Sequence, residues 1–96
     1  MAFKKKVAAA LKYDAVKDNA PRVVAAGHGR LAALIEEEAR KAGVPVYEDP
    51  ELACTLTALG VRQEIPPVLY EAVAQVIAWV YRLENEAIRK KEGEEQ

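Results

Sequence analysis

Cys54 and His28 are the residues whose types could carry out nucleophilic chemistry, and each is the only one of its kind in the 96-residue chain. A cysteine beside a histidine could act as nucleophile and base. No further residue in the pattern would orient either side chain, so we interpret Cys54 as a structural residue and His28 as a loop residue. A zinc site with several thiolate or imidazole ligands is excluded too. We therefore predict no catalytic residue, no metal site and no cofactor.

The turn Gly27-His28-Gly29 falls between an expected strand and an expected helix. Backbone N–H groups bind phosphate at such places in other folds. The next position of a Gly-x-Gly-x-x-Gly pattern is occupied here by Ala32, and no lysine follows as in a P-loop. We interpret these residues as a plain turn between strand and helix.

Charge excludes further classes of partner. Fourteen Lys and Arg residues oppose fifteen Asp and Glu residues, so the net charge of -1 lacks the basic excess of nucleic-acid-binding proteins. Lys4, Lys5 and Lys6 could contact anionic lipid, although a solvated chain end is the simpler interpretation. The apolar run over residues 7–11 is too short for a signal peptide or a membrane span. We expect a cytoplasmic protein with no nucleic-acid partner and no stable membrane insertion.

The elements that would position these residues belong to one small folded domain, because 51% of the residues are hydrophobic and 30% charged. Apolar runs predict strands over 7–13, 22–26 and 44–47, with a helix between the second and third. Strand, helix and strand in this order form a right-handed βαβ unit, whereas the short link after the first strand favours antiparallel pairing. We predict an α/β (α+β-like) fold: a small mixed three-stranded sheet containing one βαβ unit, packed by about three helices, the last one long. The expected boundaries are a basic segment 1–6, a single domain 7–89 and a frayed polar tail 90–96.

The first two helices show apolar residues on one side and charges on the other. In the first, which ends at Gly43, the pairs Glu36–Arg40 and Glu37–Lys41 have the favourable acid-first order. The second starts at Pro50, where Asp49 caps its first turn. Helical spacing predicts inner faces of Leu31, Leu34, Ile35, Ala39 and Ala42 in the first helix and of Leu52, Leu56 and Leu59 in the second.

The last helix opens at Pro66-Pro67 and has more apolar surface than one core requires. Its central stripe consists of Leu69, Val73, Val76, Val80 and Leu83. With the flanking residues the apolar arc reaches roughly 240°, against about 100° for a surface helix. Either the first helix and the sheet enclose this helix from two sides, or one flank, with Ala74 and Ile77, stays exposed as a groove for a partner peptide.

A series of motifs covers about 80 of the 96 residues, and the most specific is Ile-Pro-Pro-x-Leu-Tyr-x-Ala-Val-Ala over residues 65–74. The others are Ala10–Asp14, Ala20–Ala25, Gly27–Gly29, Gly43–Pro45, Glu48–Pro50, Leu52–Ala53, Gln63–Glu64 and Ala78–Tyr81. In this order they closely resemble the cytoplasmic C-terminal domain of the FlhB-type flagellar type III export switch protein family. The chain resembles the small stand-alone FlhB-like proteins that consist of this domain without the membrane domain.

The resemblance implies a function in flagellar protein export, where this domain recognises export substrates and takes part in switching from rod and hook subunits to filament subunits. It also implies a substrate-docking patch at the positions of Ala20, Pro21, Ala74 and Ile77. Ala74 and Ile77 belong as well to the surplus flank of the last helix, so helical spacing and the resemblance point to the same surface.

Self-cleavage is the one reaction associated with this family, and it takes place between Asn and Pro of an Asn-Pro-Thr-His motif. The corresponding positions here are Phe3, Lys4, Lys5 and Lys6, which offer no side-chain amide to cyclise. We therefore expect no autocleavage and no enzyme. The strand that precedes the motif in the family is missing as well, which would leave one sheet edge open for pairing with another chain.

Our leading hypothesis is a non-enzymatic export component that binds rod- and hook-class export substrates or the truncated membrane export switch component. Such a protein would act in the cytoplasm, at the cytoplasmic face of the flagellar export gate. The alternative is a cytoplasmic regulatory or assembly protein whose apolar surface, including Ile77, forms a homodimer without an export role.

Overall fold

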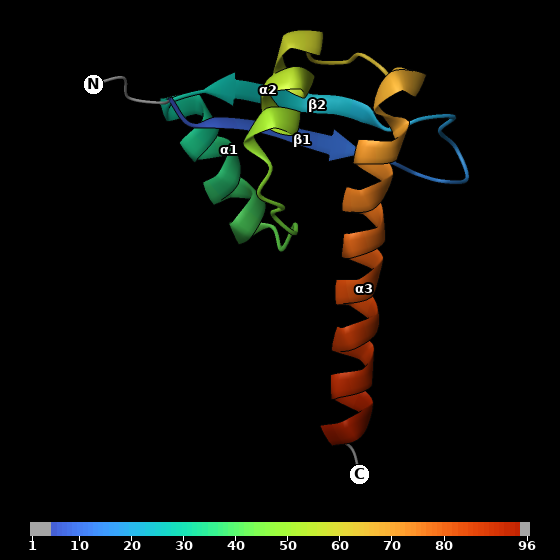
Figure 1. Cartoon of the computed structure of the whole chain (residues 1–96). Coiled ribbons are helices and arrows are strands. Elements are labelled where there is room, and N and C mark those ends of the chain that lie inside the picture. Colours follow the sequence, from blue (N-terminus) through green and yellow to red (C-terminus); the bar gives the residue numbers. More distant parts are fainter. Residues whose placement is uncertain (1–4, 95–96) are drawn as a thin grey trace. The chain divides into compact units, whose positions relative to one another are not determined.

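The computed structural model describes residues 5–94, with side chains up to residue 89, and the chain divides into two compact units between Pro66 and Pro67. The first unit contains β1 (Val7–Lys12), β2 (Arg22–His28), α1 (Arg30–Lys41) and α2 (Pro50–Leu59) (Figure 1). The second contains the 3-10 turn η1 (Pro67–Leu69) and the long helix α3 (Tyr70–Glu94). The predicted fold class, with both strands and helices and a long last helix, is confirmed.

The sheet is an antiparallel pair of β1 and β2, as the short link between them predicts. Val7 lies opposite His28, and Lys12 lies opposite Arg22. The register shifts between Ala10 and Leu11, so that β2 carries one extra residue at this point. Such a bulge increases the local twist and reverses the direction in which the following backbone groups of the strand point.

The predicted third strand over 44–47, and with it the βαβ unit, is wrong for the part of the chain that the structure describes. The backbone N–H of Val44 turns back and donates to the carbonyl of Ala39 at 2.8 Å, which closes the end of α1. Gly43 makes this possible with a φ of 74°. Pro45 then has no N–H to offer a sheet. The β-branched residues of this segment favour a strand by type. Residue type alone does not show where the backbone groups form hydrogen bonds.

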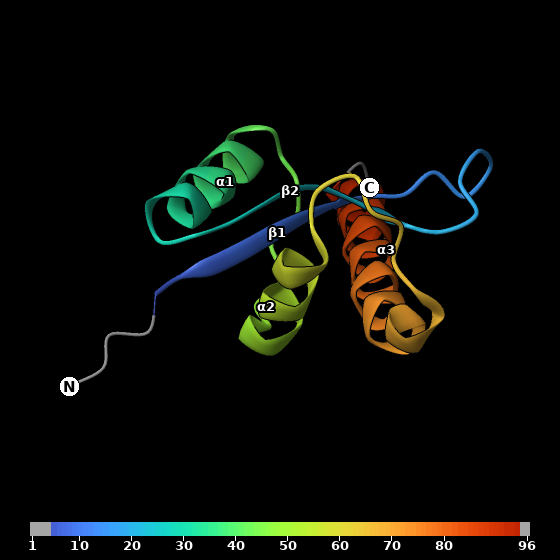
Figure 2. The same cartoon turned by 90° about the horizontal axis from the view of Figure 1, so that it is seen from above.

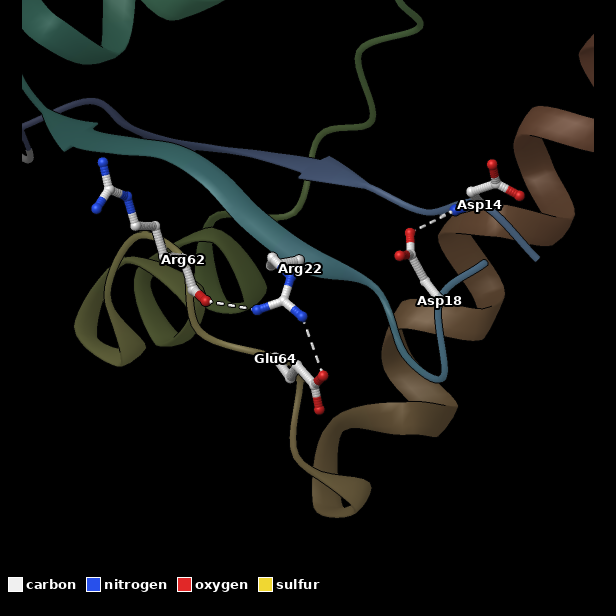
Figure 3. Close-up of polar contacts among 5 residues, drawn as sticks. All are labelled: Asp14, Asp18, Arg22, Arg62 and Glu64. Atoms are coloured by element: carbon white, nitrogen blue, oxygen red, sulfur yellow. Dashed lines mark hydrogen bonds and ion pairs between the residues drawn. The ribbon is translucent and has the colours of Figure 1, made fainter. Parts of the chain in front are cut away.

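The loop between β1 and β2 is held by two carboxylates (Figure 3). Asp14 Oδ1 accepts hydrogen bonds from the N–H groups of Val16 at 2.9 Å and Lys17 at 3.3 Å, and Asp18 Oδ2 accepts from the N–H of Asp14 at 2.9 Å. The Lys17 N–H also donates to the Asp14 carbonyl at 3.2 Å, which makes residues 14–17 a β-turn.

Helices α1 and α2 lie on opposite sides of the two strands (Figure 2). The core of the first unit is small, because the strands contribute mainly alanines. Its buried apolar residues are Ala8, Ala20, Val23, Ala32, Leu52, Leu56 and Ile65.

The face that α1 turns toward the strands differs from the predicted one. Ala32 is fully buried, whereas Leu31 and Leu34 are each 50% exposed. The rotation of the helix is set by its entry, because α1 leaves β2 through Gly29 alone, at φ 60° and ψ -123°. Gly27 of β2 meanwhile lies directly against the side chain of Leu31, where any Cβ on residue 27 would come within 2.4 Å of Leu31 Cδ2. Among the residues of α1, Ala32 alone is fully buried.

The predictions for α2 and for the charged face of α1 are confirmed. Asp49 Oδ1 accepts from the N–H of Leu52 at 3.1 Å and caps α2, which starts at Pro50 and is followed by Gly60 at φ 102°. In α1, Arg40 lies 3.6 Å from Glu36 and Lys41 lies 3.3 Å from Glu37. Glu36 also pairs with Lys6 at 2.6 Å, which ties the residue before β1 to α1.

In the second unit, α3 continues to Glu94 and so includes most of the segment expected as a frayed tail. Val73 of the predicted stripe is buried, and Leu69, Val76, Val80 and Leu83 are half-buried. Tyr70 and Tyr81 on one flank are 46% and 53% exposed. Within the described residues, neither α3 nor another helix is long and apolar enough to cross a membrane.

Candidate partner-binding surfaces

The four residues predicted to bind a partner fall into two pairs with different surroundings. Ala20 and Pro21 belong to the first unit and are both buried, with Ala20 only 3% exposed. Ala74 and Ile77 belong to the second unit, where Ala74 is exposed and Ile77 half-buried. As the chain is folded here, only the second pair offers side-chain surface to a partner.

Residues 62–65 form backbone hydrogen bonds with Pro21 and with the start of β2. They run antiparallel to the start of β2 and add a short third segment to its outer edge, with a bridge between Arg22 and Glu64. The Ile65 N–H donates to the Pro21 carbonyl at 2.9 Å, and the Val23 N–H donates to the Gln63 carbonyl at 3.1 Å. The Arg62 N–H donates to the Val23 carbonyl at 2.6 Å. The bulge in β2 is what turns both polar groups of Val23 toward this segment and away from β1.

The side chain of Arg22 also binds residues 62 and 64 (Figure 3). Its Nη1 donates to the Arg62 carbonyl at 2.9 Å, and its Nη2 lies 3.0 Å from Glu64 Oε1. Arg62 has a φ of 75°, in the left-handed region that only glycine adopts without cost. The interactions with β2 and with Arg22 hold this residue in that conformation.

Sequence patterns do not predict the pair of Arg22 and Glu64, because 42 residues separate them along the chain. A signal was present: Ile65 is an isolated apolar residue between polar neighbours and Pro66, which is the pattern of a very short buried strand. Opposite charges at Arg22 and Glu64 are the expected cross-strand pair for such a segment.

The outer edge of β1 presents unpaired backbone groups in the first unit. The Gly29 N–H donates to the Lys6 carbonyl at 2.7 Å, which makes these two residues a hydrogen-bonded pair. In the register that follows, the backbone groups of Ala8 and Ala10 point to β2, and those of Val7 and Ala9 point away from it. Within the described residues the outward groups of Val7 and Ala9 have no hydrogen-bond partner. An edge of this kind can pair with an extended segment of another chain.

The residues considered for chemistry show no arrangement that would activate them. His28 is an exposed residue at the end of β2, and Cys54 is exposed on α2. The N–H of Gly29 is used by the Lys6 carbonyl, so this amide is not available to a phosphate. Among residues 5–89, whose side chains the structure describes, no group of three or more His, Cys, Asp or Glu side chains could hold a metal ion.

Comparison with known protein families finds similarity over most of the chain. A model of the family described as FlhB HrpN YscU SpaS matches residues 5–80. The uncharacterized protein YlqH of Bacillus subtilis (strain 168) is 46% identical over 84 residues, which are 88% of this chain and 90% of that protein.

Two longer relatives match over a smaller part of their own length. The flagellar biosynthetic protein FlhB of Aquifex aeolicus (strain VF5) is 49% identical over 75 residues, which are 77% of this chain and 21% of that protein. The hypersensitivity response secretion protein HrcU of Ralstonia nicotianae is 36% identical over 73 residues, 76% of this chain and 20% of that protein. The chain thus spans about a fifth of the length of FlhB and HrcU.

Proposed function

The chain belongs to the FlhB HrpN YscU SpaS family, and from this membership we propose that it is a non-enzymatic component of a type III protein export apparatus, in the first place the flagellar one. It would take the place of the C-terminal cytoplasmic part of the export switch protein, since that is the part of the longer relatives that it resembles. The relatives named for flagellar biosynthesis and for secretion both support export as the common process.

The open edge of β1 is the surface through which the chain would bind the export apparatus. Val7 and Ala9 present two consecutive sets of unpaired N–H and C=O groups on the side away from β2. An extended peptide can add to such an edge as a further strand, with main-chain hydrogen bonds supplying the affinity. We assign this edge to an extended segment of the membrane-bound export component.

The predicted docking residues have two separate functions in this proposal. Ala74 and Ile77 lie three residues apart on α3 and so on the same side of the helix, where they would contact export substrates. Burial of Ala20 and Pro21 supports a positioning function instead, because the Pro21 carbonyl is bonded to Ile65 at the end of the first unit.

The proposal includes no catalytic step. Positions 3–6, which correspond to the self-cleavage motif, read Phe-Lys-Lys-Lys, and residues 3 and 4 lie outside the described part of the structure. Without an asparagine there, the chain cannot form the succinimide that side-chain cyclisation requires. A mass spectrum of the purified protein should show one uncleaved chain.

The substitution Ala9→Pro tests the open edge. Proline removes an N–H that donates to no acceptor among the described residues, so β1 and β2 should still pair, while an added strand would lose a hydrogen bond and meet the proline ring. The assay is the motility of flagellated cells whose own FlhB is truncated before its cytoplasmic domain. We expect the wild-type chain to restore motility and Ala9→Pro to abolish it, with an unfolding midpoint close to that of the wild type.

The matched control is Ala15→Pro, at the second position of the turn 14–17, where proline is favoured. This variant should restore motility as well as the wild type does. Failure of the wild-type chain itself to restore motility or to co-purify with the truncated component would refute the export function. Full activity of Ala9→Pro would refute only the use of the β1 edge.

A further inference from the structure

Helix α1 leaves part of its apolar side uncovered. Its buried face is centred on Ala32, with Ile35 and Ala39 half-buried on the same side. Leu31 and Leu34, which the amphipathic pattern places on the inner face, are instead 50% exposed. Two half-exposed leucines one turn apart are more than a single stray apolar residue on a surface.

These leucines line an open depression on the outside of α1, together with Ala33, Arg30 and Glu37. Arg30 and Glu37 are seven residues apart, which places them about 10 Å apart along the helix and only about 20° apart around it. The depression therefore has a positive end and a negative end, with apolar residues between them. Arg30 makes no hydrogen bond or ion pair among the described residues, whereas Glu37 pairs with Lys41 at 3.3 Å.

This surface is complementary to itself when turned around. A two-fold axis that passes between Ala33 and Leu34 would set the α1 helices of two copies antiparallel, so that residue 30 of each faces residue 37 of the other. Both Arg30–Glu37 contacts are then attractive, and each Leu34 lies opposite the small Ala33 of the other copy. Interfaces related by a two-fold axis are the commonest type in homo-oligomers. The net charge of -1 adds little repulsion between the copies.

We propose that the outer face of α1, formed by Arg30, Leu31, Ala33, Leu34 and Glu37, binds the same face of a second copy of this chain in an antiparallel two-fold pair. One helix face from each copy makes a small interface, so the pair is a transient dimer that forms in the micromolar to millimolar range. The contact does not involve the outward groups of Val7 and Ala9, so it is independent of the export proposal.

Charge exchange tests this geometry with the full-length chain. In Arg30→Glu both intermolecular contacts become acid facing acid, and in Glu37→Arg both become base facing base. Sedimentation velocity of the wild type from about 10 µM to 1 mM should show a rising average mass. Each single variant should sediment as a monomer over the same range, since its dissociation constant should rise by at least about tenfold.

An equimolar mixture of the two variants is the decisive sample. One copy then carries glutamate and the other arginine at both positions, so both contacts are attractive again and the dimer should return to within about threefold of the wild-type affinity. The control Lys17→Glu changes the charge by the same amount as Arg30→Glu but lies on the exposed loop, and it should dimerise like the wild type. Circular dichroism checks that all variants stay folded.

Three results would overturn the proposal. A wild-type chain that remains monomeric at 1 mM would show that the face does not bind a second copy. Single variants that dimerise like the wild type would place the contact on another surface, such as α3. A mixture that stays monomeric while the wild type dimerises would exclude the antiparallel pairing.

Discussion

Gly27→Ala tests how closely α1 packs on β2. A Cβ on residue 27 would lie 2.4 Å from Leu31 Cδ2, 2.6 Å from Cγ and 3.0 Å from Cβ. Cδ2 and Cγ lie too close for any real contact, so the Leu31 side chain would have to leave its position against β2, whereas its Cβ needs a shift of only a few tenths of an ångström. Overpacking of this kind costs about 1–3 kcal/mol, so we expect Gly27→Ala to lower the free energy of unfolding by that amount.

A double-mutant cycle with Leu31→Ala separates the clash from other effects. Leu31→Ala alone should cost about 1 kcal/mol, because the leucine is only half-buried. Independent effects would then add to about 2–4 kcal/mol. We expect the double variant to lose only about 1 kcal/mol, because the atoms at 2.4 and 2.6 Å are gone and alanine lowers the entropy of the unfolded chain relative to glycine.

Urea unfolding at low micromolar protein concentration is the appropriate assay, since the two leucine variants also alter the proposed contact between copies. For a chain of this size 1 kcal/mol corresponds to about 4–8 °C in the unfolding midpoint, so the effects are well within reach of thermal scans too. Additivity of the two single changes to within about 0.5 kcal/mol would refute the reasoning, since it would show that residues 27 and 31 do not press on one another.

Two further changes probe conformations set by single residues. Asp49→Ala removes the side-chain acceptor of the Leu52 N–H and should cost about 1 kcal/mol in urea unfolding, whereas Asp49→Asn, which keeps an oxygen acceptor there, should cost much less. Arg62→Gly removes the cost of a positive φ of 75° and should stabilise the protein by about 1 kcal/mol, while Arg62→Ala should not. An equal effect of both variants on the free energy of unfolding would show that the backbone conformation of residue 62 is unimportant.

Sequence patterns predicted the features that are formed by residues close together in the sequence. The two antiparallel strands, the capped helix at Pro50 and the ion pairs of α1 follow from residues that are at most four positions apart, or from a short link. The rotation of α1 did not follow, because hydrophobic spacing alone does not include the entry through Gly29 or the close approach of Leu31 to Gly27.

The candidate site was predictable only where local spacing or family resemblance determines it. Ala74 and Ile77 were selected by helical spacing and by family resemblance together, and the structure leaves both with surface to offer. Ala20 and Pro21 were selected by resemblance alone, and their burial depends on tertiary contacts that include the segment after α2. The open edge of β1 was expected from resemblance, but which residues point outward requires the register of the hairpin.

The pairing of residues 62–65 with the start of β2 also determines when the first unit can finish folding. Its hydrogen bonds join Arg22 to residues 40 and 42 positions further along the chain, whereas β1 and β2 meet through a short loop. During synthesis the hairpin and α1 can form early, but Val23 receives its last backbone partners only after residue 63 has left the ribosome. Every intermediate before that point exposes the outer edge of β2 in addition to that of β1, and this is the stage at which the nascent chain is most exposed to aggregation.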